Sequence, residues 1–170
     1  IKLYDAHGNK TECAFTLTGD SSTEVDFPFK NPLGKTTFRH YIDENTLVLR
    51  VKNCREHSGL MYLKKDTVRL KYAYEADGAA FFLWDLRKAL PDSFIIGEHK
   101  HTFQFKAVVL PNQNQKINYQ SWELSFTDQS LFDTLYLEVN TDTAKQYTRF
   151  GDSFFPFKNT VQLKRKVEKG

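Results

Sequence analysis

The sequence has little of what builds a disulfide or metal framework. It contains two cysteines, Cys13 and Cys54, and one methionine in 170 residues. Neither cysteine belongs to a CxxC pair, and two thiols without a nearby histidine pair supply too few ligands for a zinc site. The composition therefore argues against a cysteine-rich scaffold and against a zinc-ribbon type of domain.

Long apolar runs and a strong excess of one charge are also missing. No stretch approaches the roughly 20 apolar residues that cross a bilayer as a helix, so we expect no membrane span. The net charge is only +3, and the one dense basic run, at 164–166, is typical of a solvated edge strand. Nucleic-acid binders concentrate basic residues on one face, so we expect no nucleic-acid partner.

What the sequence does contain is short alternation of apolar and polar residues, separated by turn signals rich in Asn, Asp, Gly and Pro. Such runs occur at 47–51, 68–74, 103–107, 122–126 and 135–139. Many short strands at this spacing predict an all-β fold, an Ig-like antiparallel β-sandwich. One segment differs: Asp85 is a candidate N-cap and Pro91 a stop signal, so we expect one short helix near 85–90.

The polar run at 111–116 is the best candidate for a domain boundary. We expect two sandwiches in tandem, 1–112 and 113–170, or one sandwich with a long loop at this point. The chain opens in an alternating strand at 1–5, followed by turn residues and a second alternating strand at 11–17, which predicts a β-hairpin. A lone hairpin is marginal in water, so we expect it to close a preceding domain and the chain to be a downstream piece of a larger protein.

The two cysteines leave two interpretations open. Cys13 shares a strand face with Phe15 and Leu17, and Cys54 follows the strand at 47–53. A bridge between the two would close a loop of about 40 residues and stabilise the fold by roughly 3–4 kcal/mol in the chain-entropy model. The alternative is a small buried thiol at 13 and an unpaired thiol at a strand end.

Several segments are similar to a known family. The hairpin with Tyr4-Asp5-Ala6-His7-Gly8-Asn9-Lys10-Thr11, the connector at 84–93, the strands at 122–126 and 130–137, and the segment at 150–167 resemble a non-catalytic Ig-like region. That region lies downstream of the peptidase domain in M23-type, lysostaphin-like cell-wall metallopeptidases of the Bacteroidetes. The resemblance implies a secreted module of the periplasm, cell envelope or extracellular space, an accessory or spacer region of a peptidoglycan metallopeptidase. Its implied partners are neighbouring domains of the same polypeptide, with peptidoglycan or envelope proteins as further candidates.

The histidines bear on zinc catalysis. M23 enzymes bind zinc through H-x-H and H-x-x-x-D motifs, and His99-Lys100-His101 matches the first, with both rings on one face of a strand. The second motif is missing, because His40 and Asp43 stand one residue too close and would lie on opposite faces. We therefore expect no enzyme activity and no metal site in this chain, with His99 and His101 as the only weak candidates. Zinc is expected only in a catalytic domain elsewhere in the parent protein.

The alternative function is a glycan- or protein-binding module. Phe154, Phe155 and Phe157 fall in one expected loop, and Trp122 is a further aromatic candidate; exposed rings can stack on sugars or fill a partner's pocket. A second interpretation is that these phenylalanines close the open end of a sandwich.

Overall fold

The computed structural model describes residues 2–4, 10–12, 34–145, 147–151 and 155–166. The chain divides into two compact units, Ile1–Lys30 and Asn31–Gly170. In the first unit, β1 (Lys2–Tyr4) and β2 (Lys10–Glu12) pair antiparallel, with Leu3 opposite Thr11. This pairing is the hairpin that the alternation near the start of the sequence predicts.

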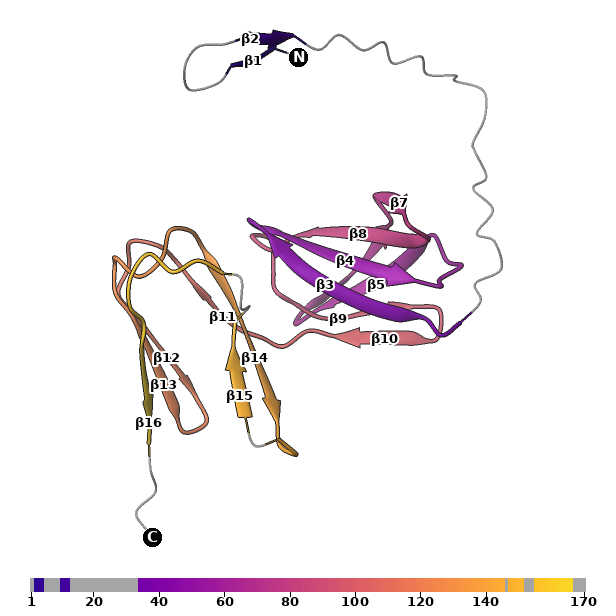
Figure 1. Cartoon of the computed structure of the whole chain (residues 1–170). Coiled ribbons are helices and arrows are strands. Elements are labelled where there is room, and N and C mark those ends of the chain that lie inside the picture. The colour runs from indigo at the N-terminus through magenta and orange to yellow at the C-terminus, as the bar shows by residue number, and fades with distance from the viewer. Residues whose placement is uncertain (1, 5–9, 13–33, 146, 152–154, 167–170) are drawn as a thin grey trace. The chain divides into compact units, whose positions relative to one another are not determined.

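The second unit consists of antiparallel β-sheets that pack as Ig-like β-sandwiches, which confirms the fold class expected from the sequence. One sheet has the order β3-β4-β8-β7, and the sheet that faces it has the order β10-β9-β5-β6 (Figure 1). The strands of the first sheet are β3 (Thr37–Asp43), β4 (Thr46–Lys52), β7 (Tyr74–Ala76) and β8 (Ala79–Asp85). Those of the second are β5 (Ser58–Leu63), β6 (Asp66–Lys71), β9 (Pro91–Ile96) and β10 (His99–Thr102).

The inward faces of these two sheets form an aromatic and aliphatic core. Leu47, Leu49 and Val51 alternate along β4 and are almost fully buried, as the period-two pattern predicts. The rings of Phe82 on β8 and Phe94 on β9 meet between the sheets, with their centroids 4.8 Å apart. Burying one such side chain contributes about 1.5–3 kcal/mol, so the core holds the two sheets together.

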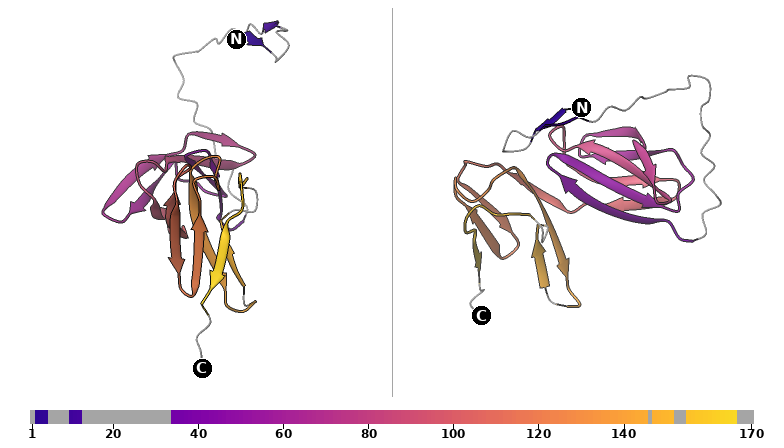
Figure 2. Two further views of the ribbon diagram at one scale, coloured as in Figure 1. Left: turned by 90° about the vertical axis from the view of Figure 1, so that its left-hand side faces the viewer. Right: turned by 45° about the horizontal axis from the view of Figure 1, so that its top comes forward.

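The remaining strands form a second pair of sheets, seen in further views in Figure 2. One has the order β11-β14-β15, formed by β11 (Phe105–Val109), β14 (Leu135–Asp142) and β15 (Tyr147–Phe150). The other has the order β12-β13-β16, formed by β12 (Gln115–Tyr119), β13 (Trp122–Phe126) and β16 (Gln162–Arg165). Their shared core consists of Val109, Leu124, Phe126, Leu131, Leu135, Leu137 and Val139.

The expected domain boundary at 112–113 falls in the turn between β11 and β12. β11 lies before that boundary in the sequence, yet it pairs with β14, with Val109 opposite Leu135. The change from one pair of sheets to the other occurs at Phe103 and Gln104, between β10 and β11.

The helix expected near 85–90 is wrong, and the part of the chain that the structure describes contains no helix. Asp85 is the last residue of β8, and its carboxylate accepts hydrogen bonds from the Arg87 backbone N–H at 3.0 Å and from the Arg87 guanidinium at 2.9 Å. The Trp84 indole N–H donates to the Ala89 carbonyl at 2.8 Å. These bonds stabilise a turn in place of helical bonds, and Pro91 then begins β9. Consistent with this, no helix in the described residues could span a membrane.

Candidate functional site

Three titratable side chains from three strands meet where the two pairs of sheets join. His40 lies on β3 and His101 on β10, the edge strands of the two facing sheets, and Glu138 lies on β14. The Nδ1 atom of His40 is 2.9 Å from Nε2 of His101. The Nε2 atom of His40 is 3.0 Å from Oε2 of Glu138. We call these three residues the His–His–Glu cluster.

Aromatic rings surround the two imidazoles. Alternation along β3 places Phe38 and His40 on the same face, and the Phe38 ring stacks on His101 with centroids 5.3 Å apart. Phe103 packs edge-on against both histidines, with centroids 5.2 Å from His40 and 5.0 Å from His101. The rings shield the cluster from water, which strengthens its hydrogen bonds and raises the cost of an unpaired charge.

This environment determines the charges of the cluster. Burial and the nearby His40 lower the pKa of His101 from 6.5 to about 4. Burial opposes ionisation of Glu138, but the hydrogen bond and charge of His40 and the hydrogen bond from Gln104 outweigh it, so the pKa of Glu138 is lowered. Glu138 is therefore a carboxylate at neutral pH and accepts from His40, while His101 is neutral.

Further hydrogen bonds join the two pairs of sheets at the same place. The Gln104 N–H donates to Glu138 Oε1 at 3.2 Å, and the Val139 N–H donates to the Gln104 carbonyl at 3.0 Å. The Phe103 N–H donates to the Asp92 carbonyl at 3.0 Å. Farther along β14, the Tyr136 hydroxyl lies 2.6 Å from Asn45 Oδ1 in the β3–β4 turn. Together with the His–His–Glu cluster, these bonds form what we call the junction.

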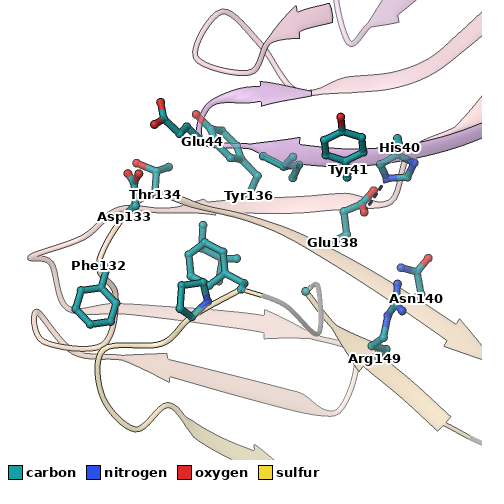
Figure 3. A pocket seen from close by; sticks show the side chains of 15 residues that line it. His40, Tyr41, Glu44, Phe132, Asp133, Thr134, Tyr136, Glu138, Asn140 and Arg149 are labelled. Atoms are coloured by element: carbon teal, nitrogen blue, oxygen red, sulfur yellow. Dashed lines mark hydrogen bonds and ion pairs between the residues drawn. The ribbon is translucent and has the colours of Figure 1, made fainter. Parts of the chain in front are cut away.

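A cavity of about 490 Å³ adjoins the junction. Its walls come from β3, from the segment at 132–134, from β14 and β15, and from Phe155 and Pro156. Figure 3 shows Asn140 and Arg149 together at one end, with Asp133 and Thr134 at the other. The Tyr41 ring points away from Glu138 in this view. The cavity lining thus includes the Arg149 guanidinium and the carboxylates of Glu44, Asp133 and Glu138.

Comparison with known proteins identifies no relative. The chain matches no protein-family model, no curated protein and no solved structure. Any functional assignment therefore depends on the geometry of this chain and on the sequence patterns described above.

The aromatic residues expected to bind a ligand are in different environments. Phe155 lines the cavity, whereas Phe157 is 49% exposed and pairs with Leu131 through an isolated bridge. Trp122 packs on the second core, and the Arg165 guanidinium lies over its ring at 5.4 Å. Phe154 lies outside the described residues. The Phe155 and Phe157 rings contact each other edge to face, with centroids 5.7 Å apart. The binding role of these residues stays a prediction.

The cysteine and metal predictions concern β10 and the end of β4. Cys54 is a buried free thiol that donates to Glu56 Oε2 at 3.2 Å, and burial, followed by that hydrogen bond, raises the pKa of Cys54 to about 12. Cys13 lies outside the described residues, so a bridge between the two stays a prediction. His99 is exposed, while His101 turns its Nε2 to His40. Within the described ranges, no group of three His, Cys, Asp or Glu side chains could hold a metal ion.

The His–His–Glu cluster is the feature that sequence reasoning missed. His40 and His101 match only halves of zinc motifs, although both lie two residues from a phenylalanine in an alternating segment. Such a pattern indicates an inward-facing, buried imidazole. The partner Glu138 had no local signal, because it is 98 residues from His40 in the sequence.

Proposed function

We propose that the chain is a non-catalytic spacer module of an exported cell-envelope protein, an accessory region of an M23-type peptidoglycan metallopeptidase. The junction is the observation that carries the spacer role. A connection of two residues, Phe103 and Gln104, has both of its N–H groups and the Gln104 carbonyl bonded to protein acceptors and donors. Hydrogen bonds at each of these groups restrain bending of the connection, so we expect a module built like this to hold its neighbours at a fixed spacing.

The envelope location and the peptidase parent are supported by sequence resemblance alone, in the hairpin and in the strands at 122–126 and 130–137. The exported location agrees with a fold of paired β-sheets whose turns lie on the surface, as in many cell-surface domains. Its partners under this proposal are the neighbouring domains of the same polypeptide.

Limited proteolysis tests the spacer role. Chymotrypsin cleaves after phenylalanine, and Phe103 is only 5% exposed, so we expect no cleavage there in the folded chain. Glu138→Ala removes the acceptor of both His40 and Gln104 and should expose this bond; cleavage would be located by mass spectrometry. Glu98→Ala, which removes an exposed carboxylate in the β9–β10 turn, is the matched control. Rapid cleavage after Phe103 in the unmodified chain would overturn the spacer proposal.

The non-catalytic part of the proposal has its own assay. Purified chain added to peptidoglycan sacculi, with and without zinc, should release no soluble fragments. Release that disappears in the His99→Ala variant would show that the H-x-H pattern is catalytic and would refute the proposal.

A ligand-binding module is the second candidate, because Phe155 contributes to the cavity beside the junction. Sacculi that retain the chain, with retention lost in Phe155→Ala and kept in Phe157→Ala, would favour this function. Equal retention of the chain and both variants would exclude the cavity as the binding site.

A further inference from the structure

The solvent side of the β3-β4-β8-β7 sheet carries an unusual group of cations. Arg39 on β3 stands directly opposite Arg50 on β4, and Thr37 stands opposite Lys52. These four side chains line a small polar pocket of about 130 Å³. Like charges directly opposite one another destabilise an antiparallel pair. The Arg50 guanidinium lies over the Phe81 ring, 5.9 Å from its centroid, but this contact leaves its charge without a counter-ion among the described residues.

In the part of the chain that the structure describes, these cations also lack acidic partners. Among the ion pairs formed within the described residues, none includes Arg39, Arg50 or Lys52. Two carboxylates, those of Asp43 and Asp85, lie on the same side of the sheet but at the end of their strands that is far from the pocket. Asp85 already binds Arg87. An anion from outside the described residues is therefore the natural partner of the pocket, since two guanidinium groups can each bind a carboxylate through two hydrogen bonds.

Aromatic rings lie beside the pocket on the same surface. Tyr41 is 48% exposed and Tyr74 is 44% exposed. The Tyr74 ring stacks on Phe81 with centroids 4.6 Å apart and an interplanar angle of 12°. Phe81 stands opposite Arg50 in the neighbouring strand, so cations and rings form one continuous surface. We call this surface the outer face: Thr37, Arg39, Tyr41, Arg50, Lys52, Tyr74, Phe81 and Leu83.

The chemistry of the outer face selects among anionic ligands. Exposed tyrosine rings offer a flat apolar surface together with a hydroxyl that can form hydrogen bonds, which suits the faces of sugar rings. Nucleic acid would require a longer basic stripe, whereas the pocket is lined by three cations. A pocket of this volume holds one carboxylate with some of its water.

We propose that the outer face binds an acidic polysaccharide, with sugar rings stacked on Tyr41 and Tyr74 and a carboxylate of the chain held by Arg39 and Arg50. Tyr41 also lines the cavity beside the junction, but Arg39, Arg50 and Tyr74 do not. The proposal goes beyond the spacer function and does not rest on it. If the outer face does not bind an acidic polysaccharide, the chymotrypsin test at Phe103 still tests the spacer role. If Phe103 is cleaved, the binding proposal still stands.

Calorimetry with two sugar chains of equal length tests the proposal. The probes are a hexamer of galacturonic acid and the neutral hexamer cellohexaose, each titrated into the full chain at low salt and again in 0.5 M NaCl. We expect the acidic hexamer to bind about tenfold tighter than the neutral one, and the difference to shrink in high salt because salt screens exposed charges. Equal affinity of the two hexamers at low salt would overturn the proposal.

Variants assign the binding to named residues. Arg39→Gln and Arg50→Gln should each weaken binding of the acidic hexamer by about tenfold and leave binding of the neutral hexamer unchanged. Tyr74→Ala should weaken binding of both hexamers. Arg69→Gln on β6 and Tyr147→Ala on β15, where Tyr147 is 50% exposed, are matched controls that should change neither. Unchanged binding of the acidic hexamer by both arginine variants would overturn the assignment.

Two further measurements keep the test decisive. Arg39→Gln relieves the opposed charges, so its melting temperature should stay equal to or rise above that of the unmodified chain, and a loss of binding cannot then be attributed to unfolding. Vesicles containing phosphatidylglycerol provide the second measurement. Retention by these vesicles through Arg39 and Arg50, without affinity for the acidic hexamer, would show a lipid surface and refute the polysaccharide proposal.

Discussion

The His–His–Glu cluster should make the fold sensitive to mild acid through His101. In the unfolded chain a histidine takes up a proton near pH 6.5, whereas the folded chain lowers the pKa of His101 to about 4. Between these values the unfolded state binds more protons, so the free energy of unfolding falls as the pH falls. The stabilisation is complete above pH 6.5 and is lost by about pH 4.

The size of the effect follows from the same two pKa values. A fall from 6.5 to about 4 corresponds to about 3 kcal/mol at about 1.4 kcal/mol per pH unit. The His101 ring keeps some contact with water, so screening reduces this figure, and we expect about 2 kcal/mol. Glu138 acts with the same sign, because its pKa is also lowered and its hydrogen bonds to His40 and Gln104 are lost when it takes up a proton.

Urea unfolding at pH 7.5, 6.0 and 4.5 measures the effect. His101→Phe keeps a flat ring against Phe38 and Phe103 but cannot titrate. At pH 7.5 this substitution should lower the free energy of unfolding by about 1 kcal/mol, because the hydrogen bond to His40 is lost. Between pH 7.5 and pH 4.5 the free energy of unfolding of the variant should then fall by about 2 kcal/mol less than that of the unmodified chain. His99→Phe, the same substitution at an exposed position of β10, should keep the original dependence. Equal losses in the unmodified chain and in His101→Phe would show that His101 does not cause the acid sensitivity.

Three other substitutions or treatments give defined outcomes. Gly59→Ala places a methyl group against the Phe94 ring and 2.7 Å from the Ile95 carbonyl oxygen, so it should lower the free energy of unfolding in urea by about 2 kcal/mol; an unchanged value would contradict the packing of β5 on β9. Tyr136→Phe removes the 2.6 Å contact with Asn45 and should cost about 1 kcal/mol in the same assay, whereas full stability would show that this bond contributes nothing to the junction. Cys54 is buried and its pKa is raised to about 12, so its thiol should resist a disulfide reagent at pH 8 in native chain and react in urea; prompt native reaction would contradict its burial.

Much of the sandwich could be predicted from the sequence because its signal is local. Leu47, Leu49 and Val51 share one face of β4, and the period-two spacing shows that this face enters the core. Leu135, Leu137 and Val139 do the same on β14, although Val48 and Tyr136 on the other faces are buried as well. The local pattern at Asp85, by contrast, wrongly predicts a helix. Its side chain can cap a helix or bind the next turn, and the Trp84–Ala89 hydrogen bond favours the turn.

The candidate site could not be predicted in this way because it depends on contacts between distant segments. His40 and His101 are 61 residues apart, and they meet only because β3 and β10 are edge strands of facing sheets. The opposed pair of Arg39 and Arg50 is likewise a property of strand register. A sequence pattern gives the face of a strand, but it does not give the partner across the sheet or across the sandwich.

The junction should hold the two pairs of sheets together as one rigid body. Backbone ¹⁵N relaxation measures this directly, by comparing the rotational correlation times of residues 37–102 and 105–165 in the same sample. We expect one correlation time for both groups at pH 7.5, and two different times in Glu138→Ala. Two different times in the unmodified chain would contradict this expectation.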